Sequence, residues 1–526
     1  MRQLHGTTKL VGLIVRRDRI RLAVWGAAIV LLVLVTAVST KDLFPTQASL
    51  DQVAAVSKDN PAALAFNGPP VALDTMGGQV AFQLGAFGLT MVGLMSVLMT
   101  SRLTRGEEES GRLELVRSMP VGRHAPLVTA AVIVVALNVV VGALTAASLI
   151  AEQLPVTGSI ALGASFIALG LLFVGLTALT AQVTENSRVA AGLAGAILGA
   201  AYALRAVGDA GGGSLSWLSP IGLAQKSRPY GDEQWWPLLL SAAIGGGLLA
   251  IAVALSNRRD FGSGLLPPRP GPARAAPSLG SELGLAVRLQ RATMLWWTVG
   301  VLALALTCGS LASTIEDFVA GNDTLAEYFD RTGVNLVDSF LATSLLLLAL
   351  LPAGAAAQML VRARSEETAN RAEAILATRS TRPRWLGSHI GVAFVGSTAA
   401  LLIGGAGLGL SAAWVLHDAG QVLRLTAASL AYLPAVWVVL GVAVTLIGLA
   451  PRAVSAVWGV WALCLVLAYF GTLIDFPAAV RDLSPFEHVP LVPAGDVEAT
   501  PLAITLAAAV ALVVAGTIGF RRRDIG

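Results

Sequence analysis

Apolar runs of about 20 residues recur along the whole chain, and they constrain its fold more than any other feature. As an α-helix, each run is long enough to cross the roughly 30 Å hydrocarbon core of a bilayer. The runs do not alternate in polarity at every second residue, which excludes an outer-membrane β-barrel. Only 13% of the residues are charged and the mean hydropathy is +0.73, whereas about a quarter of the residues of a soluble globular protein are charged. We therefore predict an all-α polytopic membrane protein.

Twelve of these runs are predicted to span the membrane. The first follows a group of arginines, but its apolar stretch is too long for the core of a typical signal peptide, so we interpret it as an uncleaved anchor. The predicted spans are residues 20–39, 80–100, 127–151, 158–183, 188–207, 236–256, 293–311, 337–360, 389–416, 424–450, 453–474 and 501–520.

The basic residues indicate how the spans are oriented. Most of the 36 Lys and Arg residues lie in the two terminal segments and in every second loop. Because such residues concentrate on the cytoplasmic side of short loops, we expect both termini in the cytoplasm and the chain in a bacterial plasma membrane. This arrangement requires an even number of spans, as predicted. The formal net charge of +4 is then a consequence of topology, and we expect no nucleic-acid partner.

Two charged loops indicate an internal duplication. The loop after the second span reads RGEEESGRLELVRSMPVGR from residue 105, and the loop after the eighth reads RSEETANRAEAILATRSTR from residue 364. At an offset of 259 residues, charged residues of the first loop match charged residues of the second. The matched pairs are Arg105 and Arg364, Glu107 and Glu366, Glu108 and Glu367, Arg112 and Arg371, Glu114 and Glu373, and Arg123 and Arg382.

The ends of the two halves agree as well. NRRDFG at 257–262 reappears as RRRDIG at 521–526, and LSP at 218–220 reappears at 483–485. Each half holds six spans in the same orientation, so we predict two parallel six-helix repeats that form a pseudo-dimer. The predicted segments are a first permease-like half at 1–260, a cytoplasmic linker rich in Pro and Gly at 261–280, and a second half at 281–526.

The duplicated loops are the leading candidates for docking a partner protein. Glu108 and Arg112, like Glu367 and Arg371, stand four residues apart, a spacing that predicts short helices stabilised by these ion pairs. The alternative is a solvated face that only follows the charge rule for cytoplasmic loops. Residues before the first and seventh spans combine helical apolar spacing with arginines, which predicts helices on the inner membrane surface.

Groups that could perform chemistry are scarce at membrane depth. No acid, histidine or metal-ligand set lies near the centre of a predicted span, which disfavours an enzyme and an ion-coupled transporter. The two cysteines, Cys308 and Cys464, lie in separate apolar runs, so neither a disulfide framework nor a metal site is expected. Several titratable residues fall at span ends, where we interpret them as reaching toward the interface: Glu152, Arg205, Asp338, His389 and Arg424.

A phosphate-binding loop for ATP is also missing from the sequence. That loop requires a lysine directly after a glycine, and none of the four lysines, Lys9, Lys41, Lys58 and Lys226, follows one. We expect no cofactor in this chain. If ATP supplies the energy, ATP and Mg²⁺ bind to a separate ATPase that docks on the cytoplasmic loops.

This layout resembles that of ABC-2-type export permeases. More specifically, the chain resembles the actinobacterial polyketide-antibiotic exporter permeases, a group with tetronasin-type resistance proteins and a mycobacterial multidrug exporter subunit. The likeness covers essentially the whole chain and is carried by the twelve-span layout and four motifs. These are RGEEESGRLELVR at 105–117, NPA at 60–62, LDTMGG at 73–78 and WLSPIG at 217–222.

The resemblance implies two copies of an ATPase subunit per permease, with the duplicated loops acting as coupling helices. After Glu373 the second loop reads AILATRS where the first reads LVRSMPV, so the two contacts are expected to be unequal. The residues that receive the coupling role by position are Arg105, Glu107, Glu108, Arg112, Glu114, Arg364, Glu366, Glu367, Arg371 and Glu373.

The resemblance also implies a substrate path between the halves, lined by the first, second and fifth spans of each. Met and Phe side chains adapt to varied apolar ligands, and the alternative is ordinary helix packing. Gly192, Gly195 and Gly199 in the fifth span are expected to permit close helix contact. The candidate path residues are Gln83, Phe87, Met91 and Met95 in the second span and Phe340, Thr343 and Ser344 in the eighth.

Together these patterns predict the permease subunit of an ATP-driven exporter in contact with the lipid bilayer. The expected substrates are hydrophobic small molecules such as drugs or polyketide-like compounds. Export of a lipid or a cell-wall precursor stays open. An ion-coupled transporter and a membrane-embedded lipid enzyme are the disfavoured alternatives.

Overall fold

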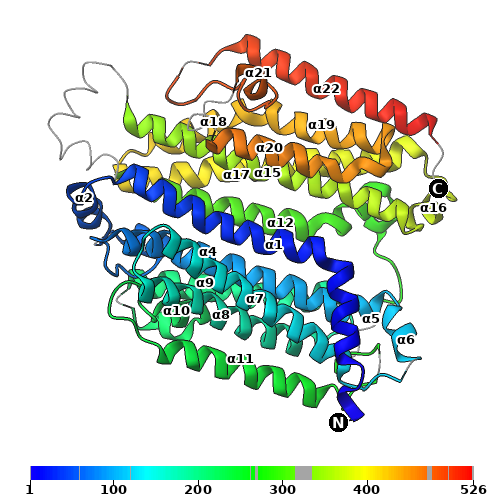
Figure 1. Cartoon of the computed structure of the whole chain (residues 1–526). Coiled ribbons are helices and arrows are strands. Elements are labelled where there is room, and N and C mark those ends of the chain that lie inside the picture. The colour runs from blue at the N-terminus through cyan, green and yellow to red at the C-terminus, as the bar shows by residue number, and fades with distance from the viewer. Residues whose placement is uncertain are drawn as a thin grey trace. The chain divides into compact units, whose positions relative to one another are not determined.

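The computed structural model of the chain describes residues 2–58, 60–118, 120–211, 213–260, 262–266, 271–313, 335–470, 477–495 and 497–523. These residues form helices and no strand. The chain divides into two compact units, Met1–Gly271 and Pro272–Gly526. The boundary falls within the Pro- and Gly-rich segment at 261–280. We call the two parts unit 1 and unit 2 and describe each by itself (Figure 1).

Unit 1 contains six long helices and several short ones. Its long helices are α1 (Thr7–Leu43), α4 (Met76–Ser101), α7 (Ala125–Ala151), α8 (Val156–Val183), α9 (Ser187–Ala210) and α11 (Trp236–Leu255). The short elements are η1 (Arg2–Leu4), α2 (Gln47–Lys58), α3 (Pro61–Asn67), the π-helical turn η2 (Arg102–Gly106), α5 (Glu107–Glu109), α6 (Arg112–Arg117), η3 (Leu215–Leu218) and α10 (Pro220–Gln225).

Unit 2 follows the same order of long helices. Those described are α12 (Glu282–Ser310), α15 (Leu336–Thr368), α17 (Arg382–Leu416), α18 (Gly420–Ser429) continuing through η5 (Leu430–Tyr432) into α19 (Leu433–Leu449), α20 (Val457–Phe470) and α22 (Ala499–Arg522). The short elements are η4 (Pro277–Gly280), α16 (Arg371–Leu376), η6 (Pro451–Ala456) and α21 (Ala478–Arg481).

The predicted number of spans is confirmed, because twelve helical segments of the described residues are long and apolar enough to cross a membrane. The predicted surface helices before the first and seventh spans are not separate elements. They are the N-terminal parts of α1 and α12, and Figure 1 shows α1 bending near its N-terminal end. Part of the predicted eleventh span, residues 471–474, lies outside the described residues.

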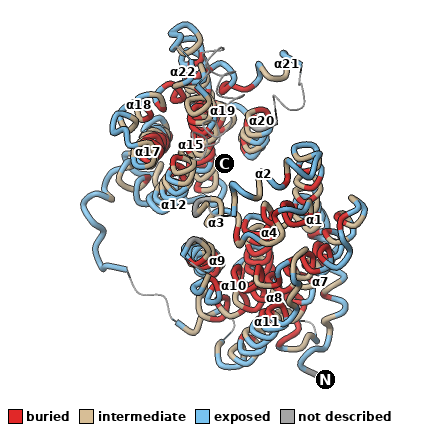
Figure 2. Tube along the Cα trace, turned by 90° about the vertical axis from the view of Figure 1, so that its left-hand side faces the viewer, coloured by how far each residue is buried: buried red, intermediate tan, exposed pale blue. Residues whose placement is uncertain are grey.

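The second and fourth spans form the core of each unit. Within the most apolar window, 67% of residues are buried in the second span and 72% in the fourth. The eighth and tenth spans, their counterparts in unit 2, reach 72% and 67%. Figure 2 shows the buried residues concentrated on these central helices, while α11 and α22 expose much of their length. The burial pattern therefore repeats from one unit to the other.

Glycines allow the fourth and sixth spans to touch through their backbones. A Cβ atom at Gly175 in α8 would lie 2.1 Å from the carbonyl oxygen of Gly245 in α11. In unit 2, a Cβ atom at Gly448 in α19 would lie 1.9 Å from the carbonyl oxygen of Gly516 in α22. Such contacts let membrane helices approach closely and pack by van der Waals forces. Each pair of helices therefore forms one tightly packed layer.

The glycines predicted to make close contacts do not make them. At Gly192, Gly195 and Gly199 in α9, an added Cβ atom would meet nothing within 4 Å. Their spacing places them together on one face of α9, away from the helices that it packs against. Spacing alone could not tell a contact face from an open one.

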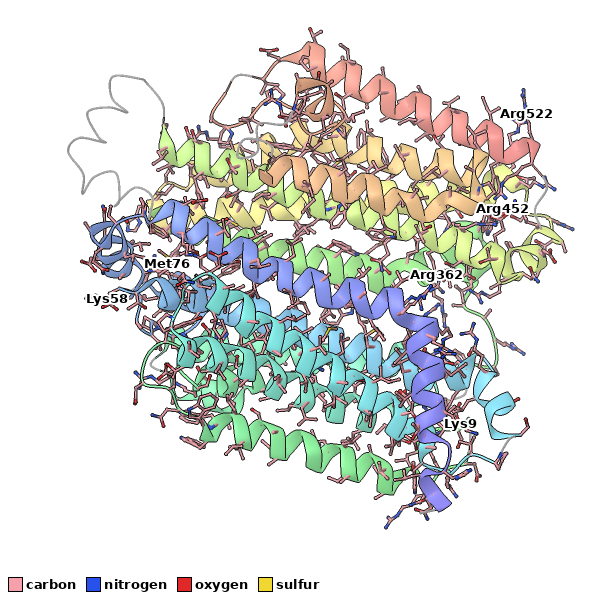
Figure 3. The ribbon with its side chains drawn as sticks, in the orientation of Figure 1. Lys9, Lys58, Met76, Arg362, Arg452 and Arg522 are labelled. Atoms are coloured by element: carbon pink, nitrogen blue, oxygen red, sulfur yellow. The ribbon has the colours of Figure 1, made fainter. Side chains whose placement is uncertain are left out.

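The helices of each unit have one end that is rich in arginine, which we call the basic end. Figure 3 shows Arg362, Arg452 and Arg522 together at this end of unit 2. In unit 1, Lys9 lies at the basic end, whereas Lys58 and Met76 lie at the opposite end. The duplicated loops are at the basic ends, where α5 and α6 follow α4 and where α16 follows α15.

Candidate functional site

The duplicated loops form the predicted short helices, but the predicted ion pairs are wrong by one residue. Arg112 Nη1 lies 3.9 Å from Glu107 Oε1, and Arg371 Nε lies 2.5 Å from Glu366 Oε2. A pair four residues apart needs an uninterrupted helix. Here the chain turns, with Gly111 at φ +71° and Asn370 at φ +57°, which are left-handed conformations favoured by these residue types. The turn breaks the expected register at the same place in both loops.

In unit 1, Glu108, the second matched glutamate of the loop, joins two arginines from different parts of the chain. Glu108 accepts hydrogen bonds from Arg105 Nη1 at 2.5 Å and from Arg259 Nη2 and Nη1 at 2.7 and 3.0 Å. Arg259 belongs to the segment after α11, which we call the tail of unit 1. Both arginines also bind the carbonyl oxygen of Ser263 in this tail, at 2.8 and 2.9 Å.

A further arginine of the loop binds the same tail through backbone groups. Arg123 Nη2 lies 3.1, 3.2 and 3.2 Å from the carbonyl oxygens of Ser256, Asn257 and Arg259. Carbonyl groups at the end of a helix carry partial negative charge and attract cations. Beside it, His124 Nδ1 lies 3.0 Å from Ser256 Oγ. Burial and the charge of Arg123 lower the pKa of His124.

Unit 2 repeats this arrangement with the matching residues. Glu367 Oε2 forms an ion pair with Arg364 Nη1 at 2.8 Å and accepts a hydrogen bond from Arg523 Nη2 at 2.7 Å. Arg382 Nη1 donates to the carbonyl oxygen of Arg523 at 2.8 Å. We call these two sets the loop–tail clusters: Arg105, Glu108, Arg123 and Arg259 in unit 1, and Arg364, Glu367, Arg382 and Arg523 in unit 2.

The first matched glutamate of each loop, Glu107 or Glu366, has different ion-pair partners in the two units. In unit 1, Glu107 accepts two hydrogen bonds from Arg17 of α1, at 2.8 and 2.9 Å. Arg17 and Arg102 also bind Asp18, whose side chain is only 3% exposed. We call Arg17, Asp18, Arg102 and Glu107 the first-helix cluster.

In unit 2, Glu366 is paired with nearby arginines of α15 and α16. Glu366 accepts from Arg362 at 2.8 Å and from Arg371 at 2.5 Å. The first helix of this unit makes a neutral contact instead, in which Gln290 Nε2 lies 2.7 Å from His389 Nδ1. His389 is only 2% exposed, so our interpretation that it reaches toward the interface is wrong.

The predicted coupling residues separate into a buried layer and an exposed layer. Arg105, Glu107, Glu366 and Glu367 are buried, and Glu108 and Arg364 are half-buried. Arg112 and Glu114 on α6, and Arg371 and Glu373 on α16, are exposed. A partner protein can reach the exposed layer directly, whereas the buried layer holds each loop against its own unit.

The predicted path residues of α4 do not all share one face. Phe87 is 46% exposed, Gln83 and Met91 are half-buried, and Met95 is fully buried in the core of unit 1. A step of four residues turns an α-helix by about 400°, so three steps rotate the stripe by about 120°. Met95 is therefore not on the open face, and the exposed residue nearest this end of the stripe is Leu98.

The candidates on α15 divide in the same way. Thr343 is exposed and Phe340 is half-buried, but Ser344 is only 4% exposed and faces the core of unit 2. Each unit thus presents an open stripe on its second helix, formed by Gln83, Phe87 and Met91 in unit 1 and by Phe340 and Thr343 in unit 2. The stripe of unit 1 has the larger apolar side chains.

A known protein matches nearly the full length of the chain. The "Multidrug efflux system permease protein Rv1217c" of Mycobacterium tuberculosis strain H37Rv is 38% identical over 524 residues, which cover 99% of this chain and 95% of the relative. The chain belongs to this permease family. Residues 279–521 also match the family described as "Multidrug efflux system permease Rv1217c, C-terminal domain". That match covers α12 through α22 of this permease.

The permease also contains a buried arginine that our sequence interpretation placed at the membrane interface. Arg205 of α9 is 0% exposed and does not reach toward the interface. Its Nη2 lies 2.7 Å from the carbonyl oxygen of Ala65 and its Nη1 lies 3.4 Å from Asp209 Oδ2. Asp209 stands four residues later in the same helix, and this spacing could have predicted that Arg205 is paired. Arg205 thereby holds the C-terminal end of α3 on α9.

Other charged residues at the span ends are paired and partly exposed. Lys41 Nζ lies 2.6 Å from Glu152 Oε2, and Arg424 Nη2 lies 2.7 Å from Asp338 Oδ2. Both pairs join separate helices at the end of their unit opposite the basic end. The described residues contain no group of three or more His, Cys, Asp or Glu side chains that could hold a metal ion.

Proposed function

We propose that this chain is the permease subunit of an ATP-driven exporter of the ABC-2 type, powered by a separate ATPase. Its substrates are hydrophobic drugs or polyketide-like compounds, and it works in the bacterial plasma membrane with both termini in the cytoplasm. The full-length relative named as a multidrug efflux system permease supports this proposal. The resemblance to polyketide-antibiotic exporter permeases supports the substrate class.

The observation that carries the proposal is the pair of exposed short helices, α6 and α16, at the basic ends of the two units. Each follows the second helix of its unit, and each presents an exposed arginine and an exposed glutamate. Two matching surfaces fit two copies of one ATPase subunit, which would bind ATP and Mg²⁺. A buried layer of ion pairs supports each surface, so a push on the short helix is passed to the membrane helices.

Transport by the two-component system tests this proposal. Inside-out vesicles containing the permease and an ABC ATPase subunit that co-purifies with it should accumulate a hydrophobic fluorescent dye when ATP and Mg²⁺ are added. Vesicles with the permease alone, or with an ATPase unable to hydrolyse ATP, should not. Uptake by the permease alone, driven by an ion gradient, would contradict the proposal.

Charge reversal on the short helices tests where the ATPase binds. Glu114 and Glu373 are exposed and have no ion-pair partner in the described part of the chain, so reversing them disturbs no internal pair. Glu114→Arg with Glu373→Arg should lower co-purification of the ATPase about tenfold, since close charge pairs at an interface contribute roughly 1.5 kcal/mol or more. The matched control is Arg188→Glu with Arg452→Glu, two exposed arginines at the starts of α9 and η6. Equal binding by both double variants would place the docking surface elsewhere.

A further inference from the structure

The tails after α11 and α22 carry a duplicated arginine that the proposed docking surface does not use. Arg259 and Arg523 occupy the same position in the repeated segments NRRDFG and RRRDIG. Each lies inside a loop–tail cluster, where it binds the second acid of the loop at 2.7 Å. The preceding arginines, Arg258 and Arg522, are exposed. The structure thus separates two neighbouring arginines into an inner and an outer one in both units.

The inner arginine of unit 1 is held by more than one group, and that of unit 2 is held by Glu367. Arg259 uses Nη1 and Nη2 on Glu108, and its Nε donates to Gln182 Oε1 at the end of α8 at 2.7 Å. Its side chain is 9% exposed, and that of Glu108 is 10% exposed. In unit 2 the side chains of Glu367 and Arg523 are 2% and 15% exposed. Opening such a pair would leave buried charge without a partner, so loop and tail are held together.

A second link holds the same two segments independently of the acid. Arg123 and Arg382, at the end of each loop, donate to the backbone carbonyl oxygens of Arg259 and Arg523. The loop therefore holds the tail through a side-chain pair and through a backbone contact. The same two links occur in both units.

The tail leads directly into a rigid layer of each unit. It continues α11 in unit 1 and α22 in unit 2, and these helices touch α8 and α19 through the glycine contacts described above. Because backbones in contact cannot slide without a clash, each two-helix layer shifts as one body. A displacement of the loop is thereby transferred to the fourth and sixth helices of its unit.

We propose that Arg259 and Arg523 are positioning residues that transmit movement of the coupling loop to the sixth membrane helix of each unit. This inference rests on the proposed function, in which an ATPase moves the loops through α6 and α16. The tail arginine gives each loop a second route for moving the membrane helices, in addition to the covalent connection to the helices on either side. A purely structural role predicts that loss of these arginines lowers the amount of folded permease without changing its coupling.

Transport per ATP hydrolysed separates these two roles. Arg259→Ala with Arg523→Ala should leave the ATPase bound, because both side chains lie behind the exposed short helices. The variant should transport about tenfold less dye per ATP, a change within the range of coupling between sites. The matched control, Arg258→Ala with Arg522→Ala, should transport as the wild type does. Unchanged transport per ATP in the folded inner-arginine variant would overturn the inference.

Lysine variants keep the inference testable if the alanine variant does not fold. Arg259→Lys with Arg523→Lys retains the charge, but one ammonium group cannot replace a planar fork that binds Glu108 and Gln182 together. These variants should fold and show a smaller loss of transport per ATP, about threefold. Wild-type transport per ATP in the lysine variants would overturn the inference. Failure of the wild-type permease to bind any ATPase would instead refute the proposed function.

Discussion

The two units share the loop–tail cluster but differ in the charges around the first helix. In both, the second matched glutamate of the loop, Glu108 or Glu367, joins an arginine of the loop to an arginine of the tail, and the tail arginine donates through Nη2 at 2.7 Å. The first matched glutamate is bound by α1 in unit 1, through Arg17, but by its own helix in unit 2, through Arg362. The loop of unit 1 is therefore tied to the first helix by ion pairs, and among the described residues of unit 2 no such pair joins the loop to α12.

The difference shows that a buried carboxylate and the arginines that bind it are replaced together by neutral residues. Before the first and seventh spans the repeat has an offset of 272 residues, at which Trp25 matches Trp297 and Asp18 matches Gln290. The arginines that bind Asp18 are not matched by arginines in unit 2. Leu289 stands where unit 1 has Arg17, and Val361 stands where it has Arg102. A buried carboxylate without its arginines would be strongly unfavourable. The two halves thus reached two self-consistent solutions, one ionic and one neutral.

The largest effect that separates the units should come from Asp18. Asp18→Asn leaves Arg17, Arg21 and Arg102 around a neutral side chain, so the free energy of unfolding should fall by about 3 kcal/mol. Gln290→Ala in unit 2 removes a neutral contact and should cost about 1 kcal/mol. Denaturant unfolding of the purified permease in detergent measures both. Equal losses would show that the ionic cluster is no stronger than its neutral counterpart.

A smaller effect, on specificity, should separate the open stripes of α4 and α15. Phe87→Ala should change the export of individual hydrophobic compounds by about tenfold, because it reshapes an apolar contact surface. Thr343→Ala on α15 removes less apolar surface and should change the profile less. The measurement is an efflux profile over several unrelated compounds, normalised to the permease content of the membrane.

Met95→Ala is the matched control for the stripe. Its side chain is fully buried, so its truncation should lower the amount of folded permease by about 2–5 kcal/mol of stability and reduce export of every compound alike. If Phe87→Ala gives the same uniform loss, the stripe of unit 1 is a packing surface.

The smallest difference should arise in the middle of the third helices. Asn138 of α7 is 1% exposed and donates to Ser96 Oγ on α4 at 3.0 Å. Its counterpart in unit 2, Ser397, donates to the carbonyl oxygen of Phe394 in its own helix at 3.2 Å, and no bond to another helix is found among the described residues. Hydrogen bonds between membrane helices contribute about 0.6 kcal/mol on average, so Asn138→Ala should cost roughly 1 kcal/mol and Ser397→Ala less than half of that. Equal costs in the same denaturant series would remove this distinction.

Most of the membrane fold could be predicted from sequence, because every backbone group in a bilayer must be satisfied within its own helix. Hydropathy alone therefore located the twelve spans. It could not locate the break of the tenth span at Leu430–Tyr432 or the π-helical turn at Arg102–Gly106. Both interrupt runs whose composition remains apolar or helix-forming. Packing against neighbouring helices determines where a helix is interrupted, and the periodicity of apolar residues in the sequence does not reveal it.

The candidate site was predictable in its residues but not in its contacts. The repeat identified the charged residues of both loops, since identical charges at a constant offset need no structural information. The pairing failed because the chain turns at Gly111 and Asn370. These two residues occupy matching positions and both favour a left-handed turn, so the signal was present. The partner arginines of the tail lie about 150 residues away and could not be paired from local spacing.

The contact between α3 and Arg205 has a consequence for the order in which unit 1 is assembled. Arg205 follows Leu64, one of its backbone partners, by 141 residues. At a synthesis rate of about 5–20 residues per second, the arginine is made roughly 7–28 seconds after the segment that it holds. During this interval the last carbonyl groups of α3 lack the arginine that binds them in the folded unit. The segment between the first two membrane helices can therefore reach its final position only after the fifth has been synthesised.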